Sequence, residues 1–112
     1  MSETGPAAEH GKACGGSIKR AFDFLGKRWN GVILGTLMNG ACGFAELRRA
    51  IDGISDSVLS DRLTELSDAG LVHRTVDAGP PVSVTYQLTD SGEALLPALN
   101  ALATWAEENL TP

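Results

Sequence analysis

The chain has 112 residues, of which 43% are hydrophobic and 21% are charged. These values are typical of one soluble globular domain. Its longest apolar stretch, residues 32–38, is much shorter than the roughly 20 residues that a membrane-spanning helix needs. The first residues show no basic segment followed by an apolar run, so they do not resemble a signal peptide. We therefore expect a cytoplasmic protein with no membrane partner.

The formal net charge is −5, but the charges are unevenly distributed. All nine Lys and Arg residues lie within residues 12–74, where seven acidic residues leave a net charge of +2. Residues 75–112 carry five acidic residues and no basic one. Only the middle of the chain can therefore approach a phosphate backbone favourably.

The sequence shows no signature of catalysis or metal binding. The two cysteines, Cys14 and Cys42, are too few for a disulfide framework, and neither belongs to a metal-type pair. Two histidines add no ligand cluster, so we expect no metal ion and no cofactor. No nucleophile–base pair, carboxylate dyad or phosphate-binding glycine loop can be assembled, which argues against an enzyme.

The N-terminal part of the chain predicts a tail followed by two helices. The small, polar and glycine-rich composition of residues 1–16 predicts a flexible tail, and residues 17–112 form the domain. Apolar residues at helical spacing predict a first helix at residues 17–25. Residues 29–38 are apolar on most sides, which predicts a buried central helix.

Two short amphipathic helices are expected next. Residues 44–50 place Arg48 and Arg49 outward, opposite the apolar positions. A further helix follows the Asp-Gly-Ile-Ser break, with Ser55 as its N-cap, and ends at residue 69. Two such helices joined by a short turn form a helix-turn-helix pattern.

The C-terminal part predicts a hairpin and one long helix. Residues 71–76 and 82–89 are rich in β-branched residues and flank a Gly-Pro turn. The last helix is expected at residues 90–110, with Thr89 as its cap. This order predicts a mainly α fold with a small β-hairpin (α+β). It is that of a winged helix-turn-helix with an additional C-terminal helix.

This last helix has two apolar faces, which need two surfaces to cover them. One surface is the domain's own core, and a second copy of the chain most economically supplies the other. Burial of both faces within one protomer is the alternative. We expect a homodimer whose interface includes one of the two faces: Leu95, Leu99, Leu102 and Ala106.

The helix after Ser55 has an unusual polar face. Its leucines share one side, whereas the opposite side carries small polar residues, among them Ser57, Ser60, Asp61 and Thr64. A helix that enters the major groove of DNA needs such short hydrogen-bonding side chains. A solvated, serine-rich helix is the alternative. Arg48, Arg49 and Arg62 are candidates for phosphate contacts.

Several segments together resemble the HxlR-type transcriptional regulators, which are related to the MarR group. They are LGKRW (25–29), GFAELRRAIDGIS (43–55), VLSDRLTELSDAGLVHR (58–74) and YQLTDSGEALLPALNALATWA (86–106), so that the resemblance covers residues 14–109. It implies a homodimeric, sequence-specific DNA-binding regulator whose recognition helix follows Ser55. The partner would be a pseudo-palindromic operator in double-stranded DNA.

The resemblance also implies roles for three further residues. Lys27 and Arg28 match the family's Lys-Trp element and are candidates for phosphate contacts. Cys14 stands where a family cysteine senses oxidants or electrophiles, just ahead of the first expected helix. A helix N-terminus and nearby lysines would lower the pKa of its thiol. We expect Cys42 to be a small packing residue. The sequence leaves room for a small reactive or apolar effector at the dimer interface.

The chain departs from the family pattern at three places. Gly43 stands where a basic residue usually precedes the phenylalanine, and the wing has no base after Pro80 and Pro81. Asp56 and Asp61 replace the more usual Gln, Lys or Arg. These differences concern affinity and sequence preference rather than the fold. Asp56 suits the first turn of a helix, whereas Asp61 could read a cytosine or pair with a neighbour.

A second function remains open at this point. The acidic C-terminal part and the bare wing favour a winged-helix protein-interaction module that does not bind DNA.

Overall fold

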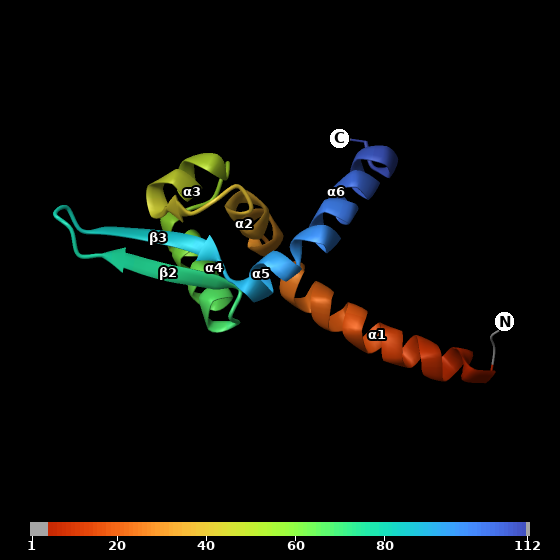
Figure 1. The fold of residues 1–112 in the computed structure, drawn as a ribbon. Helices are drawn as coiled ribbons and strands as arrows, with labels where there is room; N and C mark the ends of the chain where they lie inside the picture. The colour runs from red at the N-terminus through yellow and green to blue at the C-terminus, as the bar shows by residue number, and fades with distance from the viewer. Residues whose placement is uncertain (1–4, 112) are drawn as a thin grey trace.

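The expected run of helices, hairpin and final helical segment is present in the computed structural model, which describes residues 5–111 and, from residue 15 on, their side chains. Figure 1 shows the elements in chain order. They are α1 (Gly5–Leu25), α2 (Asn30–Leu37), β1 (Cys42–Gly43), α3 (Phe44–Ala50), α4 (Asp56–Asp68), β2 (Val72–Asp77), β3 (Ser83–Leu88), α5 (Asp90–Ala94) and α6 (Leu96–Asn109).

The core lies where α2, α3 and α4 meet the sheet. Leu59, Leu63 and Leu66 of α4 are buried there, as their spacing predicted, and burial of each leucine contributes about 1.5–3 kcal/mol. The side chain of Asn30 is also fully buried, and its Nδ2 donates a hydrogen bond to the carbonyl of Phe24 at 3.0 Å. The other buried hydrophobic residues are Ile33, Leu34, Leu37, Leu47, Ile51, Ile54, Val72 and Leu88.

The sheet has three antiparallel strands in the order β1-β3-β2. The predicted hairpin pairs Val72 with Leu88 and Asp77 with Ser83. The sequence did not predict β1, because its two residues are too few to show a period of two. β1 pairs Cys42 with Tyr86 and thus fastens the segment before α3 to the hairpin.

The predicted start of the first helix is wrong, since α1 begins at Gly5 rather than at residue 17. Part of the segment expected to be a flexible tail is therefore helical. Pro6 suits the first turn of a helix, where an amide hydrogen is not needed, and the alanines after it favour the helix. Gly11, Gly15 and Gly16 suggested a tail, because each costs about 1 kcal/mol relative to Ala inside a helix.

The predicted last helix is divided in two at Leu95. Pro97 has no amide hydrogen to donate to the carbonyl of Glu93, so the chain bends between α5 and α6. The expected cap is confirmed: the hydroxyl of Thr89 accepts from the amide of Gly92 at 3.1 Å and donates to the carbonyl of Gly70 at 2.6 Å. Gly92 has no side chain because a Cβ would lie 2.2 Å from the carbonyl oxygen of Leu71. This junction sets the direction of α6.

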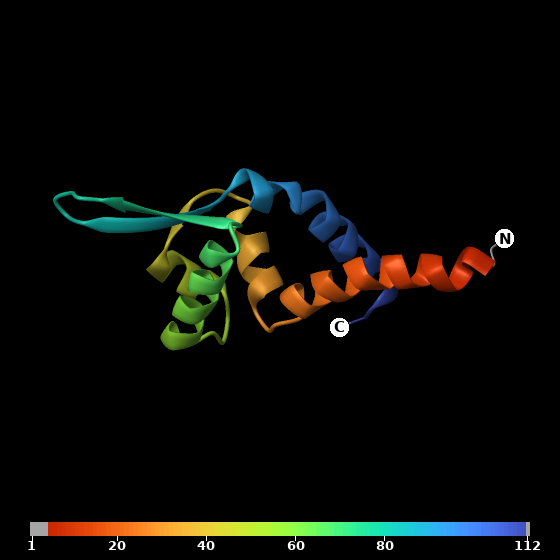
Figure 2. The ribbon, with the colours of Figure 1, turned by 90° about the horizontal axis from the view of Figure 1, so that it is seen from below.

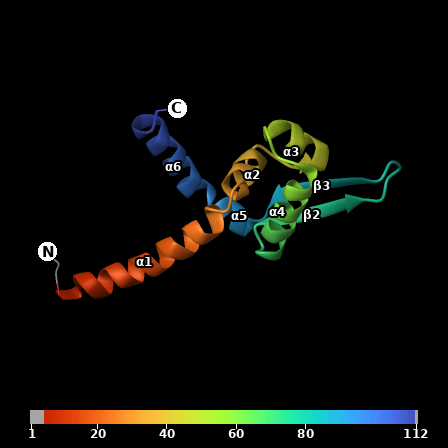
Figure 3. The same ribbon diagram turned by 180° about the vertical axis from the view of Figure 1, so that it is seen from behind.

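The molecule is elongated. Its radius of gyration is 17.2 Å, whereas a compact domain of this length has about 13 Å. Figures 1 and 3 show α1 and α6 leaving the body in different directions, while the hairpin projects from the opposite end. Figure 2, in which the molecule is seen from below, shows the same two helices extending beyond the core. We refer to α1 and α6 as the two arms.

Candidate nucleic-acid interface

Helices α3 and α4 form the predicted helix-turn-helix. The amide of Gly43 donates to Oε1 of Glu46 at 2.8 Å, which satisfies the start of α3. The turn between the helices includes Gly53 with a φ of 87°, in the left-handed region that favours glycine. Ser55 then caps α4, because its hydroxyl accepts from the amide of Val58 at 3.2 Å, as the sequence predicted.

The polar face of α4 is exposed. Ser57, Ser60, Asp61 and Thr64 all face away from the core. An open hollow of about 360 Å³ separates this face from the hairpin. Its lining includes Ser60, Thr64 and Ser67 from α4 together with Arg74 and Tyr86 from the hairpin strands. A row of small hydroxyls therefore stands beside a cationic side chain on the wing.

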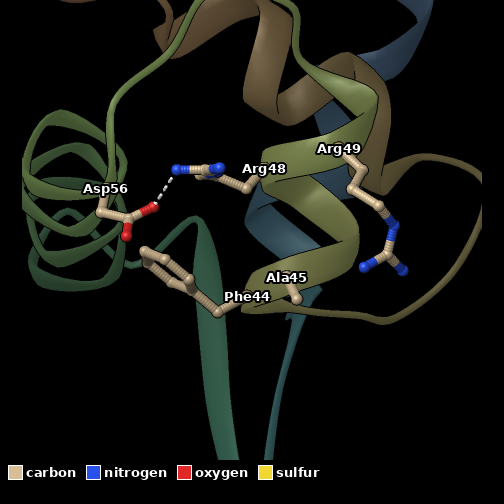
Figure 4. Close-up of a pocket in the computed structure, with 5 residues that line it drawn as sticks. All are labelled: Phe44, Ala45, Arg48, Arg49 and Asp56. Carbon is tan, nitrogen blue, oxygen red and sulfur yellow. Dashed lines mark hydrogen bonds and ion pairs between the residues drawn. The ribbon is translucent and has the colours of Figure 1, made fainter.

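Arg48 and Arg49 lie on α3, beside the beginning of α4. Nη1 of Arg48 lies 2.6 Å from Oδ1 of Asp56. Figure 4 shows this pair across the gap between the two helices, with Arg49 directed to another side of α3. Both arginines, with Asp56, line an open hollow of about 270 Å³. The guanidinium of Arg49 makes no ion pair with the side chains that the structure describes.

The other three basic candidates lie away from this hollow and have partners of their own. Glu65 pairs with Lys27 at 2.7 Å and with Arg62 at 2.5 Å. The hydrogen bond from Lys27, followed by the charge of Arg62, holds the pKa of Glu65 below its ordinary value. Arg62 is half-buried on the flank of α4, off the polar face. The guanidinium of Arg28 lies 4.6 Å from the ring centroid of Trp29, at cation–π distance. Glu65 thus joins the α1–α2 turn to α4.

The two cysteines lie in different parts of the structure, Cys42 in β1 and Cys14 in α1. The thiol of Cys42 is half-buried and points to the carbonyl of Gly40 at 3.7 Å. Burial and the nearby charge of Glu46 raise the pKa of Cys42, so it is a thiol rather than a thiolate at neutral pH. Cys14 lies inside α1, so its expected place ahead of the first helix is wrong. Its side chain lies outside the described residues.

Large apolar side chains are exposed on both arms. The predicted interface residue Leu102 is 44% exposed, whereas Leu95 and Leu99 are half-buried and pack against the core of their own protomer. Ala106 is half-buried. Sequence reasoning missed Trp105, three residues after Leu102. Among the side chains that the structure describes, the other large exposed apolar residues on or next to the arms are Ile18 and Phe22 of α1 and Leu110, directly after α6.

Two observations concern metals and membranes. Among the described residues, no group of three or more His, Cys, Asp and Glu side chains gathers closely enough to hold a metal ion. No helix within residues 5–111 combines the length and apolarity required to cross a membrane.

Comparisons with known proteins agree with this geometry. Residues 24–112 match the family described as HxlR-like helix-turn-helix. The chain is 43% identical over 95 residues to the HTH-type transcriptional regulator YvaP of Bacillus subtilis, covering 85% of this chain and 88% of the relative.

Two solved structures are similar as well. The reduced form of the transcriptional regulator YodB from B. subtilis superposes with a TM-score of 0.77 at 40% identity, covering 86% of this chain and 94% of that one. YodB is also known in diamide-treated and quinone-bound forms. The redox regulator HypR in its reduced form superposes with a TM-score of 0.79 at 32% identity, covering 83% of this chain and 92% of that one.

Proposed function

Because the chain belongs to the HxlR-like helix-turn-helix family of transcriptional regulators, we propose that it acts as a homodimer on a pseudo-palindromic operator in double-stranded DNA. The observation that carries this proposal is the exposed row of small polar side chains on α4, beside the wing. The family assignment favours this function over an interaction module without DNA binding. As a DNA-binding regulator, the protein would act in the cytoplasm.

The residues of the helix-turn-helix divide into two roles. Ser57, Ser60, Asp61 and Thr64 are short enough to let α4 enter the major groove and read base edges. Arg49 and Arg48, on the neighbouring helix α3, would contact phosphates, which supply affinity without sequence preference. Lys27, Arg28 and Arg62 are weaker candidates, since each has a partner within the protomer.

The arms support homodimerisation. A monomer would leave Phe22, Trp105 and other large apolar side chains in water on two helices that project from the body. A second copy of the chain can cover both arms at once, and twofold symmetry would then present two α4 helices to one face of DNA. Leu102 belongs to this surface, whereas Leu95 and Leu99 are shared with the core.

An oxidant or electrophile is the best supported effector class. YodB and HypR, which this chain resembles, are known in oxidised, diamide-treated or quinone-bound forms. Cys14 is the candidate sensor, because Cys42 is half-buried with a raised pKa. Diamide would take two electrons and two protons from two thiols as they form a disulfide, whereas a quinone would alkylate a single thiolate.

A selection from random duplexes tests DNA recognition. We expect one enriched sequence with half-sites one helical turn apart, roughly 34–36 Å. Thr64→Ala should change the preferred sequence. Arg49→Ala should weaken all duplexes alike and flatten the salt dependence by up to about 0.9 per lost contact. If no sequence is enriched, the protein is an interaction module instead.

Treatment of the operator complex with diamide or a quinone tests the sensor. The wild type should lose binding with either reagent and recover on reduction only after diamide. Cys14→Ser should bind DNA and ignore both reagents, with Cys42→Ser as the matched control that still responds to the quinone. Equal loss of binding by Cys14→Ser and the wild type would remove Cys14 as the sensor.

A further inference from the structure

The acidic residue at the start of α4 is paired with a cation that faces DNA. Nη1 of Arg48 and Oδ1 of Asp56 are 2.6 Å apart, and their side chains are 49% and 70% exposed. We propose that Asp56 competes with DNA phosphate for Arg48 and thereby lowers the affinity and the salt dependence of DNA binding. This inference rests on the proposed function and adds to it a residue that tunes affinity.

The position of Asp56 is one that would otherwise attract a phosphate. Asp56 is the first residue of α4, after the Ser55 cap. The N-terminus of a helix favours an anion, and the guanidinium of arginine binds carboxylate and phosphate oxygens with the same paired geometry. In Figure 4 the carboxylate projects from α4 into the hollow, toward the arginine of α3. The chain therefore places its own anion where a phosphate of the DNA backbone would be bound.

The exposure of the pair makes it a competitor rather than a structural link. Ion pairs between exposed side chains are weak in water, so DNA can open this one at small cost. Once open, Asp56 remains beside the phosphates and repels them. Glu65 differs, because its side chain is only 24% exposed, holds two cations at once and lies off the polar face of α4. Glu65 is part of the scaffold, whereas Asp56 lies at the interface.

The test is a set of DNA titrations with Asp56→Asn, which keeps the size of the side chain and removes its charge. Fluorescence anisotropy on a random duplex and on the selected operator, between 50 and 200 mM salt, gives affinity and salt slope. We expect Asp56→Asn to bind both duplexes about 2- to 30-fold more tightly, because two exposed pairs per dimer no longer compete. The salt slope should steepen by up to about 0.9 per protomer. Asp56→Ser serves as a second variant if the amide disturbs the start of α4.

Two comparisons distinguish the loss of the Arg48–Asp56 pair from the general effect of removing a negative charge. On the random duplex, where base readout does not contribute, Asp61→Asn removes the same charge from another exposed position of α4, and Asp61 makes no ion pair with the side chains that the structure describes, so it should tighten binding less. In an Arg48→Ala background, Asp56→Asn should lose most of its effect.

Three results would overturn the inference: weaker binding by Asp56→Asn, an equal gain from Asp61→Asn, or the same gain in the Arg48→Ala background. The proposed function fails separately, and the inference with it, if the wild type binds no duplex at all.

Discussion

Removal of the indole of Trp105 should weaken the dimer strongly. A tryptophan side chain presents up to about 250 Å² of surface. Trp105 is 53% exposed in the protomer, which leaves on the order of 130 Å² in water. Complete burial against a partner, at about 25 cal/mol per Å², would stabilise the dimer by about 3 kcal/mol per ring and ~6 kcal/mol for the symmetric pair.

Half of that burial corresponds to about 3 kcal/mol, or roughly a 100-fold change in the dissociation constant. Trp105→Ala should therefore raise the dimer dissociation constant by at least about 100-fold in sedimentation equilibrium. The stability of the isolated protomer should change little, because the ring is not part of the core. Val82→Ala is the matched control: Val82 is 69% exposed, but on the wing. If both variants dimerise as the wild type does, the face of α6 that carries Trp105 is not the dimer interface.

Three further substitutions test the core, the cap and the scaffold. Leu66→Ala, at a fully buried site, should lower the free energy of unfolding by about 2–5 kcal/mol in urea titrations, and a loss below 1 kcal/mol would contradict the packing described. Ser55→Ala should cost about 1 kcal/mol in the same assay, whereas an unchanged value would mean that the cap contributes nothing. The lowered pKa of Glu65 stabilises the fold above the ordinary glutamate value of about 4.3, and this contribution is lost as the pH falls through the lower, folded-state pKa. Glu65→Gln should therefore reduce the acid dependence of unfolding, and an identical pH profile would show that its two ion pairs do not stabilise the fold.

Local patterns in the sequence predicted most of the elements. The spacing of Leu59, Leu63 and Leu66 identified the buried side of α4, and Ser55 and Thr89 identified two caps that the structure contains. These signals work because each depends on residues within one or two helical turns. β1 was missed for the same reason, since its two residues are defined only by pairing with β3, more than 40 positions away.

The misplaced helix boundaries have a different cause. Gly11, Gly15 and Gly16 disfavour a helix individually, but α1 continues through all three. The helix expected at residues 90–110 runs through Pro97, although a proline inside a helix cannot donate the hydrogen bond to the carbonyl four residues earlier. In the structure a new helix begins at Leu96, so that Pro97 lies in the first turn of α6, where prolines are tolerated, rather than in the interior of one long helix.

The pairing of the charged residues could not be predicted from composition alone. Nine bases and seven acids between residues 12 and 74 indicate a weakly positive segment, but they do not indicate which bases are available to DNA. The acidic partner of Arg48 is eight residues away in the sequence, and that of Lys27 is 38 residues away. At these sequence separations, helical spacing does not predict which charged residues pair. After folding, Arg48, Lys27 and Arg62 each have an acidic partner, whereas Arg49 makes no ion pair with the described side chains. The number of unpaired positive side chains available to DNA is therefore smaller than the number of Lys and Arg residues in this segment. The exposed Arg48–Asp56 pair adds to that number only when it opens.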